Sequence, residues 1–260
     1  MSRAVAVDVC GCFPTGRHYA GIAHLLRSVA RGLIEELAAE APWHDMPVAL
    51  VDVETTGRDA SVDRVVELGI VIGRGGEIVA RHNWLINPSI PIPAEASAVH
   101  KITDDQVKDS PLFADVAAEI SAALAAFGGC IPGAYNAAFD KAFITNEFAR
   151  AGHKPAPGDV VPPFLRRDVD WFDPLVWARE VHKEARSRAL GEMATLLGIR
   201  LENAHRASDD AEAALRVLYT LANDVRLPRP YAAFVQEQRR LALAQADERR
   251  RYQRFTSRST

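Results

Sequence analysis

The stretch Pro47-Val48-Ala49-Leu50-Val51-Asp52-Val53-Glu54-Thr55-Thr56-Gly57 decides the fold that this sequence predicts. Its first half is a short apolar run, and polar side chains gather at its C-terminal end. Such a run is typical of a strand that is buried on both faces at the centre of a parallel or mixed sheet. We therefore expect the rest of the domain to be built around this strand.

More strands are expected after it in the chain. Residues 64–72 and 77–86 flank the turn Gly73-Arg74-Gly75-Gly76, and this arrangement predicts a hairpin that ends at Asn87-Pro88. A further strand is expected near residues 130–135. The first three strands are thus consecutive in the chain.

Helices are expected after the hairpin. The capping-box pattern Thr103-Asp104-Asp105-Gln106 and the helical spacing of later apolar residues predict a helix that ends at Gly128-Gly129. Other helices are expected at residues 139–150, 174–184 and 190–197, and from a cap at Ser208 or Asp209 to about residue 221. Strands first, then helices mixed with strands, indicate an α/β domain with a mixed central sheet.

The two ends of the chain predict helical extensions. Apolar residues recur at helical spacing from Ile22 to Leu37, which favours an amphipathic helix that packs on the domain. Residues 231–252 predict a basic helix without glycine or proline. The chain is therefore divided into an N-terminal helical extension (1–46), a central domain (47–224) and a basic C-terminal extension (225–260).

The net charge of −3 conceals a cluster of positive charge near the C-terminus. Its members are Arg239, Arg240, Arg249, Arg250, Arg251, Arg254 and Arg258. A basic tail binds phosphates by releasing counterions, whereas a charge run is more often a solvated helix face. Both interpretations stay open.

Composition indicates a folded protein with a sizeable core, because 48% of the 260 residues are hydrophobic. The sequence has no run of about eighteen apolar residues and no signal-peptide core, so the expected location is the cytoplasm. Three cysteines form no disulfide framework, and Cys10-Gly11-Cys12 lacks the second ligand pair of a structural zinc site. Free thiols are expected.

Carboxylates at the end of the central strand predict a cation site. Side chains alternate along a strand, so Asp52 and Glu54 project from the same face. Two adjacent carboxylates repel each other unless a positive charge lies between them. Oxygen ligands suit Mg²⁺ or Mn²⁺, and Mg²⁺ commonly completes its shell with water and substrate phosphate.

Two more carboxylates and a histidine fit the same site. Asp140 and Asp210 are expected near helix N-termini, where the helix dipole favours the ionised form. Four carboxylates balance two divalent ions, and two ions about 3.5 to 4 Å apart stabilise both the attacking and the leaving oxygen of a phosphodiester. His205, just before the last helix, is the expected general base.

These residues lie in the segments Val51-Asp52-Val53-Glu54-Thr55-Thr56-Gly57, Asn136-Ala137-Ala138-Phe139-Asp140 and His205-Arg206-Ala207-Ser208-Asp209-Asp210. Their order and spacing resemble the DnaQ-like DEDDh 3′ to 5′ exonuclease family, from about Val48 to Leu221. The resemblance implies a ribonuclease H-like fold and an exonuclease domain in residues 47–224.

The resemblance also implies a role for individual residues. In the family the histidine lies five positions before the last aspartate, which selects Asp210 over Asp209; for Asp209 the alternative is a helix cap. Substrate-binding positions carried over from the family are Thr55, Thr56, Gly57, His100, Asn136 and Phe139. Lys101 and Tyr135 depart from the residues frequent at their positions, glycine and histidine. Lys101 is either a phosphate contact or simply exposed.

The preferred function is DNA proofreading or repair trimming at a single-stranded or frayed 3′ end, with a DNA polymerase as a candidate partner. Trimming of RNA ends, as in ribonuclease T or oligoribonuclease, is the second hypothesis. A non-catalytic module that binds nucleic acid or a polymerase is the third. The intact set Asp52, Glu54, Asp140, His205 and Asp210 argues against the third.

Overall fold

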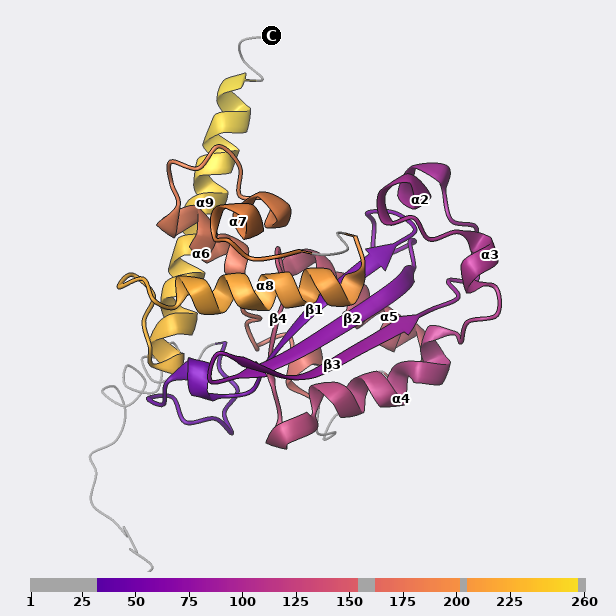
Figure 1. The fold of residues 1–260 in the computed structure, drawn as a ribbon, viewed down its shortest axis with the longest axis horizontal. Coiled ribbons are helices and arrows are strands. Elements are labelled where there is room, and N and C mark those ends of the chain that lie inside the picture. The colour runs from indigo at the N-terminus through magenta and orange to yellow at the C-terminus, as the bar shows by residue number, and fades with distance from the viewer. Residues whose placement is uncertain (1–31, 154–161, 202–204, 257–260) are drawn as a thin grey trace, which may run out of the picture.

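The computed structural model describes residues 32–153, 162–201 and 205–256, which form a sheet with helices on both faces (Figure 1). The strand order is β3-β2-β1-β4. The strands are β1 (Val48–Thr55), β2 (Val65–Arg74), β3 (Glu77–Leu85) and β4 (Ile131–Gly133). β2 pairs antiparallel with both β1 and β3, whereas β4 lies parallel to β1. The predicted mixed sheet is confirmed.

Eight α-helices lie within the described ranges. They are α2 (Ala94–His100), α3 (Asp104–Val107), α4 (Phe113–Leu124), α5 (Ala138–Arg150), α6 (Pro174–Val181), α7 (Leu190–Leu196), α8 (Ala207–Leu221) and α9 (Tyr231–Thr256). Short 3₁₀ turns cover Trp43–Asp45, Ala126–Gly128 and Pro163–Leu165. The last five of these α-helices were expected from the sequence.

Different helices cover the two faces of the sheet. Leu50 packs in a cluster with Leu218 of α8, whereas Val51 packs in a second cluster with residues of α4 and α5. Figure 1 shows α8 crossing one face and α4 and α5 on the other. Because side chains alternate along a strand, Asp52 and Glu54 project on the side of α8.

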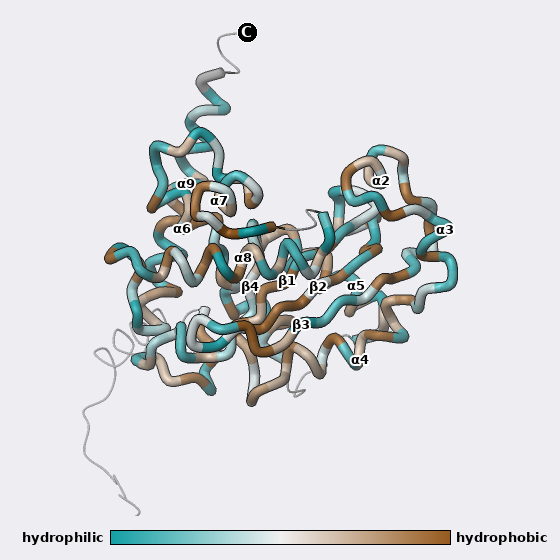
Figure 2. Tube along the Cα trace, in the orientation of Figure 1, coloured by the Kyte–Doolittle hydropathy of each residue, from teal (hydrophilic) through white to brown (hydrophobic). Residues whose placement is uncertain are grey.

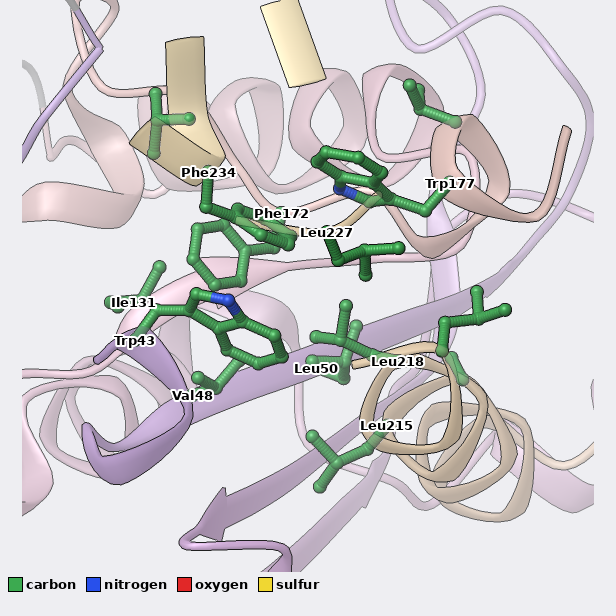
Figure 3. Packing of buried hydrophobic residues seen from close by; sticks show 14 of the residues in the cluster. Trp43, Val48, Leu50, Ile131, Phe172, Trp177, Leu215, Leu218, Leu227 and Phe234 are labelled. Atoms are coloured by element: carbon green, nitrogen blue, oxygen red, sulfur yellow. The ribbon is translucent and has the colours of Figure 1, made fainter. Parts of the chain in front are cut away.

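Helix α9 completes the core on the α8 side. The ring of Phe234 lies 4.8 Å from that of Trp43 and 4.4 Å from that of Phe172, between centroids (Figure 3). The Tyr231 hydroxyl accepts the backbone N–H of Ile34 at 3.0 Å. The far half of α9 extends past the neighbouring helices (Figure 1) and is largely hydrophilic (Figure 2). The predicted helix is present, and the proposed domain boundaries stay a prediction.

The helix predicted from Ile22 to Leu37 is wrong over its described part. Residues 33–41 form turns, and Gly32 makes a parallel bridge with Val169. Leu33 is buried in the core without belonging to a helix, so its apolar character comes from docking on the domain rather than from an amphipathic stripe. The rest of that prediction, like Cys10 and Cys12, falls on residues 1–31, outside the described ranges.

The helix predicted to end at Gly128-Gly129 is divided. The capping box at Thr103 and Gln106 begins the short α3, and α4 starts only at Phe113. Between them lies Pro111, which has no backbone N–H and restricts its predecessor to extended conformations.

Among the described helices, none is both long and apolar enough to cross a membrane.

Candidate active site

The end of β1 carries the first two carboxylates. Asp52 pairs across the sheet with Gly69 of β2, and Glu54 pairs with Glu67. Asp52 and Glu54 are half-buried, while Val51 and Val53, on either side of Asp52, are buried on the opposite face. The strand therefore presents both carboxylates on the α8 face at the edge of the core.

Asp140, in the first turn of α5, lies against the same strand. Its Oδ1 accepts the backbone N–H of Val53 at 3.1 Å. The Asp140 side chain is only 3% exposed, and burial raises the pKa of its carboxyl despite this hydrogen bond and that from its own N–H. The first turn of α5 is thus tied directly to the residue between Asp52 and Glu54.

Helix α8 supplies the third segment. Asp210 lies in its first turn, and Asp210 Oδ2 accepts the backbone N–H of His205 at 3.0 Å. His205 has a left-handed backbone, with φ of 68°, and an exposed side chain. Glu54, His205 and Asp210 each offer a ligand atom, and these atoms lie within 4.8 Å of one another. Residues distant in the sequence therefore meet at one point.

Burial and mutual repulsion raise the pKa values of the clustered carboxylates, and Arg206 and His205 offset this only in part. Burial, followed by the charges of Asp140, Asp210 and Glu54, raises the pKa of Asp52 well above its usual range. Burial and then Asp210 and Glu67 raise the pKa of Glu54 to about 7. Burial also raises the pKa of Asp210. Such a concentration of oxygen donors and negative charge fits divalent cations.

Gly69 allows α8 to approach the sheet closely. A Cβ at this position would lie 2.3 Å from the backbone of Ala207 and Ser208, at the start of α8. Gly69 also lies opposite Asp52, so this close approach brings the first turn of α8 next to the strand carboxylates. The sequence signal was a glycine inside an apolar strand, which marks either a bulge or close backbone packing.

Glu67 and Arg206 form a pair that our sequence analysis missed. Glu67 is fully buried; its Oε2 accepts the Ala207 N–H at 3.1 Å, and its Oε1 accepts from Arg206 Nη2 at 2.6 Å. Asn83 Nδ2 donates to the same Oε1 at 2.9 Å. Glu67 therefore satisfies a donor at the N-terminus of α8 and fixes the residue after His205. A lone acid within the apolar run Val65-Val66-Glu67-Leu68 was the available signal.

The predicted caps of α8 are wrong. Arg206 is the N-cap, and both Ser208 and Asp209 lie inside the helix. Asp209 instead pairs with Arg81 of β3, with a separation of 3.0 Å between Asp209 Oδ1 and Arg81 Nη1. Glu67 of strand β2 performs the capping role instead. Residues next to α8 in the sequence cannot indicate a cap that comes from a strand.

The loop after β1 is held by its own polar groups. The Thr55 hydroxyl donates to the Gly57 carbonyl at 2.5 Å, and the Thr56 hydroxyl accepts the Arg64 N–H at 3.0 Å. A Cβ at Gly57 would lie 2.4 Å from the Asp63 carboxylate. A side chain here would therefore have to displace a carboxylate that accepts the Asp59 N–H and the Thr56 hydroxyl.

His100 is the last residue of α2 and only 2% exposed. Its Nδ1 accepts the Ile102 N–H at 3.0 Å, which leaves the proton of a neutral ring on Nε2. Nε2 has no hydrogen-bond partner in the described part of the chain, although the backbone of Thr55 is nearby. Burial lowers the pKa of this imidazole. His100 is thus a neutral donor beside the end of β1.

The backbone conformation of Lys101 explains why glycine suits the position after His100. It ends α2 with a left-handed φ of 62°, and its N–H binds the Ser97 carbonyl. Glycine adopts this conformation without strain. The Lys101 ammonium donates to the Ala98 carbonyl, so it lies back over α2.

Asn136 and Phe139 flank the start of α5. Asn136 is exposed with φ of 73°, and its backbone N–H donates to Asp173 Oδ1 at 3.0 Å. Phe139 is half-buried against Phe143, with ring centroids 4.8 Å apart. Among the hydrogen bonds of the described residues, none joins the side chain of Asn136 to the carboxylate cluster.

Comparisons with known proteins show which family the chain resembles. A model of the RNase_T family, described as exonuclease, matches residues 50–218. The chain is 34% identical over 183 residues to a PolC-type DNA polymerase III of Oceanobacillus iheyensis, covering 70% of this chain but 12% of that protein. It is 31% identical over 170 residues to the DNA polymerase III subunit epsilon of Treponema pallidum, covering 65% of this chain and 74% of that protein.

Solved structures share the fold. Exonuclease X in complex with 5′ overhanging duplex DNA superposes with a TM-score of 0.54 at 21% identity, covering 72% of this chain and 99% of that chain. Exonuclease I of E. coli in complex with a dT13 oligonucleotide gives a TM-score of 0.58 at 19% identity, covering 68% and 41%. The chain therefore belongs to the RNase_T family of exonucleases, which confirms its resemblance to the DnaQ-like exonucleases and the ribonuclease H-like fold.

Proposed function

We propose that this protein is a metal-dependent 3′ to 5′ exonuclease that releases nucleoside monophosphates, with DNA as its preferred substrate. The observation that carries the proposal is the meeting of Glu54, His205 and Asp210 within 4.8 Å, beside Asp52 and the buried Asp140. Family membership supports the same reaction.

Asp52, Glu54, Asp140 and Asp210 would hold two divalent ions, Mg²⁺ or Mn²⁺. Their oxygens are hard donors, and burial followed by mutual repulsion raises their pKa values, so a bound divalent ion would favour their ionised forms. When bound, the ions would acidify water and neutralise charge that develops on the phosphate. The Val53 N–H would keep Asp140 oriented toward this site.

His205 is our proposed general base. Its side chain is exposed, while its backbone N–H is fixed by the Asp210 carboxylate. An imidazole nitrogen would accept the proton of the attacking water as the water oxygen bonds to phosphorus. The bond from phosphorus to the 3′ oxygen of the preceding nucleotide would break, and that oxygen would take a proton from water. The Glu67–Arg206 pair positions His205 through the adjacent backbone, without contacting the substrate.

The 3′ nucleotide would lie between the loop after β1 and the start of α5. Thr55, Thr56 and Gly57 would bring backbone groups close to the terminal sugar. The buried His100 Nε2–H lies beside the Thr55 backbone and would donate a hydrogen bond to the substrate strand. Asn136 and Phe139 would contact the strand near Asp140.

We propose DNA as the preferred substrate because of the proteins that this chain resembles. Two of them are named as a PolC-type DNA polymerase III and a DNA polymerase III epsilon subunit, and two structural neighbours hold DNA. A replication or repair polymerase is accordingly the proposed partner. RNA trimming stays the alternative, since the difference rests on contacts to the 2′ hydroxyl.

Matched single strands of DNA and RNA, each labelled at the 5′ end, test the proposal. We expect a ladder that shortens from the 3′ end with Mg²⁺ or Mn²⁺, is absent with EDTA and with Asp52→Ala, and forms faster on DNA. Faster shortening of RNA would reverse the substrate assignment. Tight binding of either strand without any cleavage would identify a non-catalytic module instead.

A further inference from the structure

Helices α6 and α9 are connected by hydrogen bonds from glutamine side chains of α9. Gln238 Oε1 accepts the Asp173 N–H at 2.8 Å, and Gln245 Nε2 donates to the Val176 carbonyl at 2.9 Å. Residues at spacings of four and seven share a helix face. Arg249 is four residues beyond Gln245, so α9 presents it to the C-terminal end of α6.

Two other arginines reach the same place. Arg179, on the last turns of α6, is close enough to Arg249 and Arg188 for both to lower its pKa, after the larger effect of burial. Arg188 follows α6, and its Nε donates to the His182 carbonyl at 3.1 Å. The Tyr135 hydroxyl donates to the Arg188 carbonyl at 2.5 Å and so connects this residue to the end of β4. Arginines from α6, from the segment after it and from α9 therefore lie around the C-terminal end of α6, where Arg188 also donates to the backbone of His182 and Lys183.

Carboxylates do not neutralise this cluster. In the described part of the chain, none lies within ion-pair distance of Arg179, Arg188 or Arg249. The charge of Asp173 acts on Arg179, but this carboxylate also accepts the N–H groups of Asn136, Ala137 and Leu175. Other α9 arginines differ, since they form the pairs Arg239–Asp170, Arg240–Glu237 and Arg250–Asp247. Arg239, Arg240 and Arg250 are thus neutralised locally, whereas Arg249 faces the like charge of Arg179.

We propose that Arg179, Arg188 and Arg249 form a binding site for the phosphodiester backbone of the substrate strand, upstream of the nucleotide that is removed. Guanidinium groups bind phosphate oxygens in paired hydrogen bonds, and a phosphate supplies the missing negative charge. This inference rests on the proposed nuclease function and assigns that site a substrate contact outside the catalytic cluster.

The location of the cluster fits this role. Asp173, beside Arg179, holds the backbone N–H groups of Asn136 and Ala137, which lead into the α5 turn that carries Asp140. Asp173 is the N-cap of α6, so on this proposal a strand whose 3′ end occupies the carboxylate site runs its preceding phosphates along α6 toward its C-terminal end. From there, α9 continues outward as an exposed helix (Figure 1).

Arg249→Gln and its neighbour Arg250→Gln provide a charge-matched test on the full-length protein. Hydrolysis is measured on the p-nitrophenyl ester of thymidine 5′-monophosphate, which fills only the cleavage site, and on a long single strand of DNA over a range of KCl. For Arg249→Gln we expect the ratio of kcat/KM on the strand to kcat/KM on the ester to fall about five-fold or more. The slope of log kcat/KM against log salt should become shallower by about 0.7. Arg250→Gln should keep the wild-type ratio within about two-fold.

Binding of the same strand, followed by fluorescence anisotropy in EDTA, separates this inference from the proposed function. If the wild-type protein hydrolyses neither substrate, the nuclease proposal fails, yet a weaker and less salt-dependent affinity in Arg249→Gln alone would still support the cluster. Equal losses in both variants would assign binding to the general charge of α9 and overturn the cluster. A wild-type ratio and salt slope in Arg249→Gln would overturn it as well.

Discussion

Glu54→Gln should stabilise the metal-free protein at neutral and higher pH. The pKa of Glu54 rises from an ordinary value of 4.5 to about 7 in the folded chain, through burial and then the charges of Asp210 and Glu67. The folded state therefore holds this proton more tightly than the unfolded chain does. The stability that protonation contributes is complete below the unfolded pKa and is lost as the pH rises through about 7. The full loss of unfolding free energy is about 3 kcal/mol.

Urea unfolding of both proteins in EDTA measures this effect at about pH 4.5 and about pH 8. The variant's advantage in unfolding free energy should grow by about 2 to 3 kcal/mol between these values, because glutamine loses no proton. Saturating Mg²⁺ should remove most of the advantage, since the cation stabilises the wild-type carboxylates. Glu77→Gln, at an exposed position in β3, provides the matched control. An advantage that does not change with pH would refute the reasoning.

Three substitutions test the supports of the site. His205→Ala should retain most divalent-ion binding in calorimetry but lose most of the hydrolysis rate; a fully active variant would remove His205 as the base. Gly69→Ala should cost about 1 to 3 kcal/mol in urea unfolding and reduce the rate, because its Cβ would meet the start of α8, whereas Gly191→Ala, in open space, should not. Glu67→Gln should lower kcat more than it raises KM, since it loosens Arg206 without touching substrate, and unchanged kinetics would contradict that positioning role.

The strands could be predicted because their signals are local. The apolar run before Asp52 and the glycines of the turn after β2 each indicate structure within a few residues. Gly75 and Gly76 have φ of 62° and 87°, the left-handed conformations that such a hairpin turn needs. Local turn chemistry and burial therefore point to the same register.

The errors arose where distant contacts decide the structure. Leu33 is buried through the docking of its segment, with Gly32 bridging Val169, and not through helix formation. The start of α8 is capped by Glu67, 140 positions away in the sequence. Neither relation leaves a periodic pattern in the residues concerned.

The candidate site was predictable only in part, because some of its contacts join residues that are distant in the sequence. The order and spacing of Asp52, Asp140 and Asp210 come from the sequence, and the resemblance to a family supplied their roles. The sequence could not reveal that Gly69 lets α8 approach β1, or that the Val53 N–H binds Asp140. These contacts form only when the sheet and both helices are assembled.

The most direct test of the central claim compares two variants, Asp210→Asn and Asp209→Asn. The quantity measured is kcat for release of the 3′-terminal nucleotide. These neighbours lose the same charge, but Asp210 belongs to the carboxylate cluster while Asp209 pairs with Arg81 on the surface of the sheet. We predict that Asp210→Asn loses about 10³-fold or more in kcat, whereas Asp209→Asn stays within a few-fold of wild type because a surface pair contributes only about 0 to 1 kcal/mol. An active Asp210→Asn enzyme, or equal losses in both variants, would contradict the proposed site.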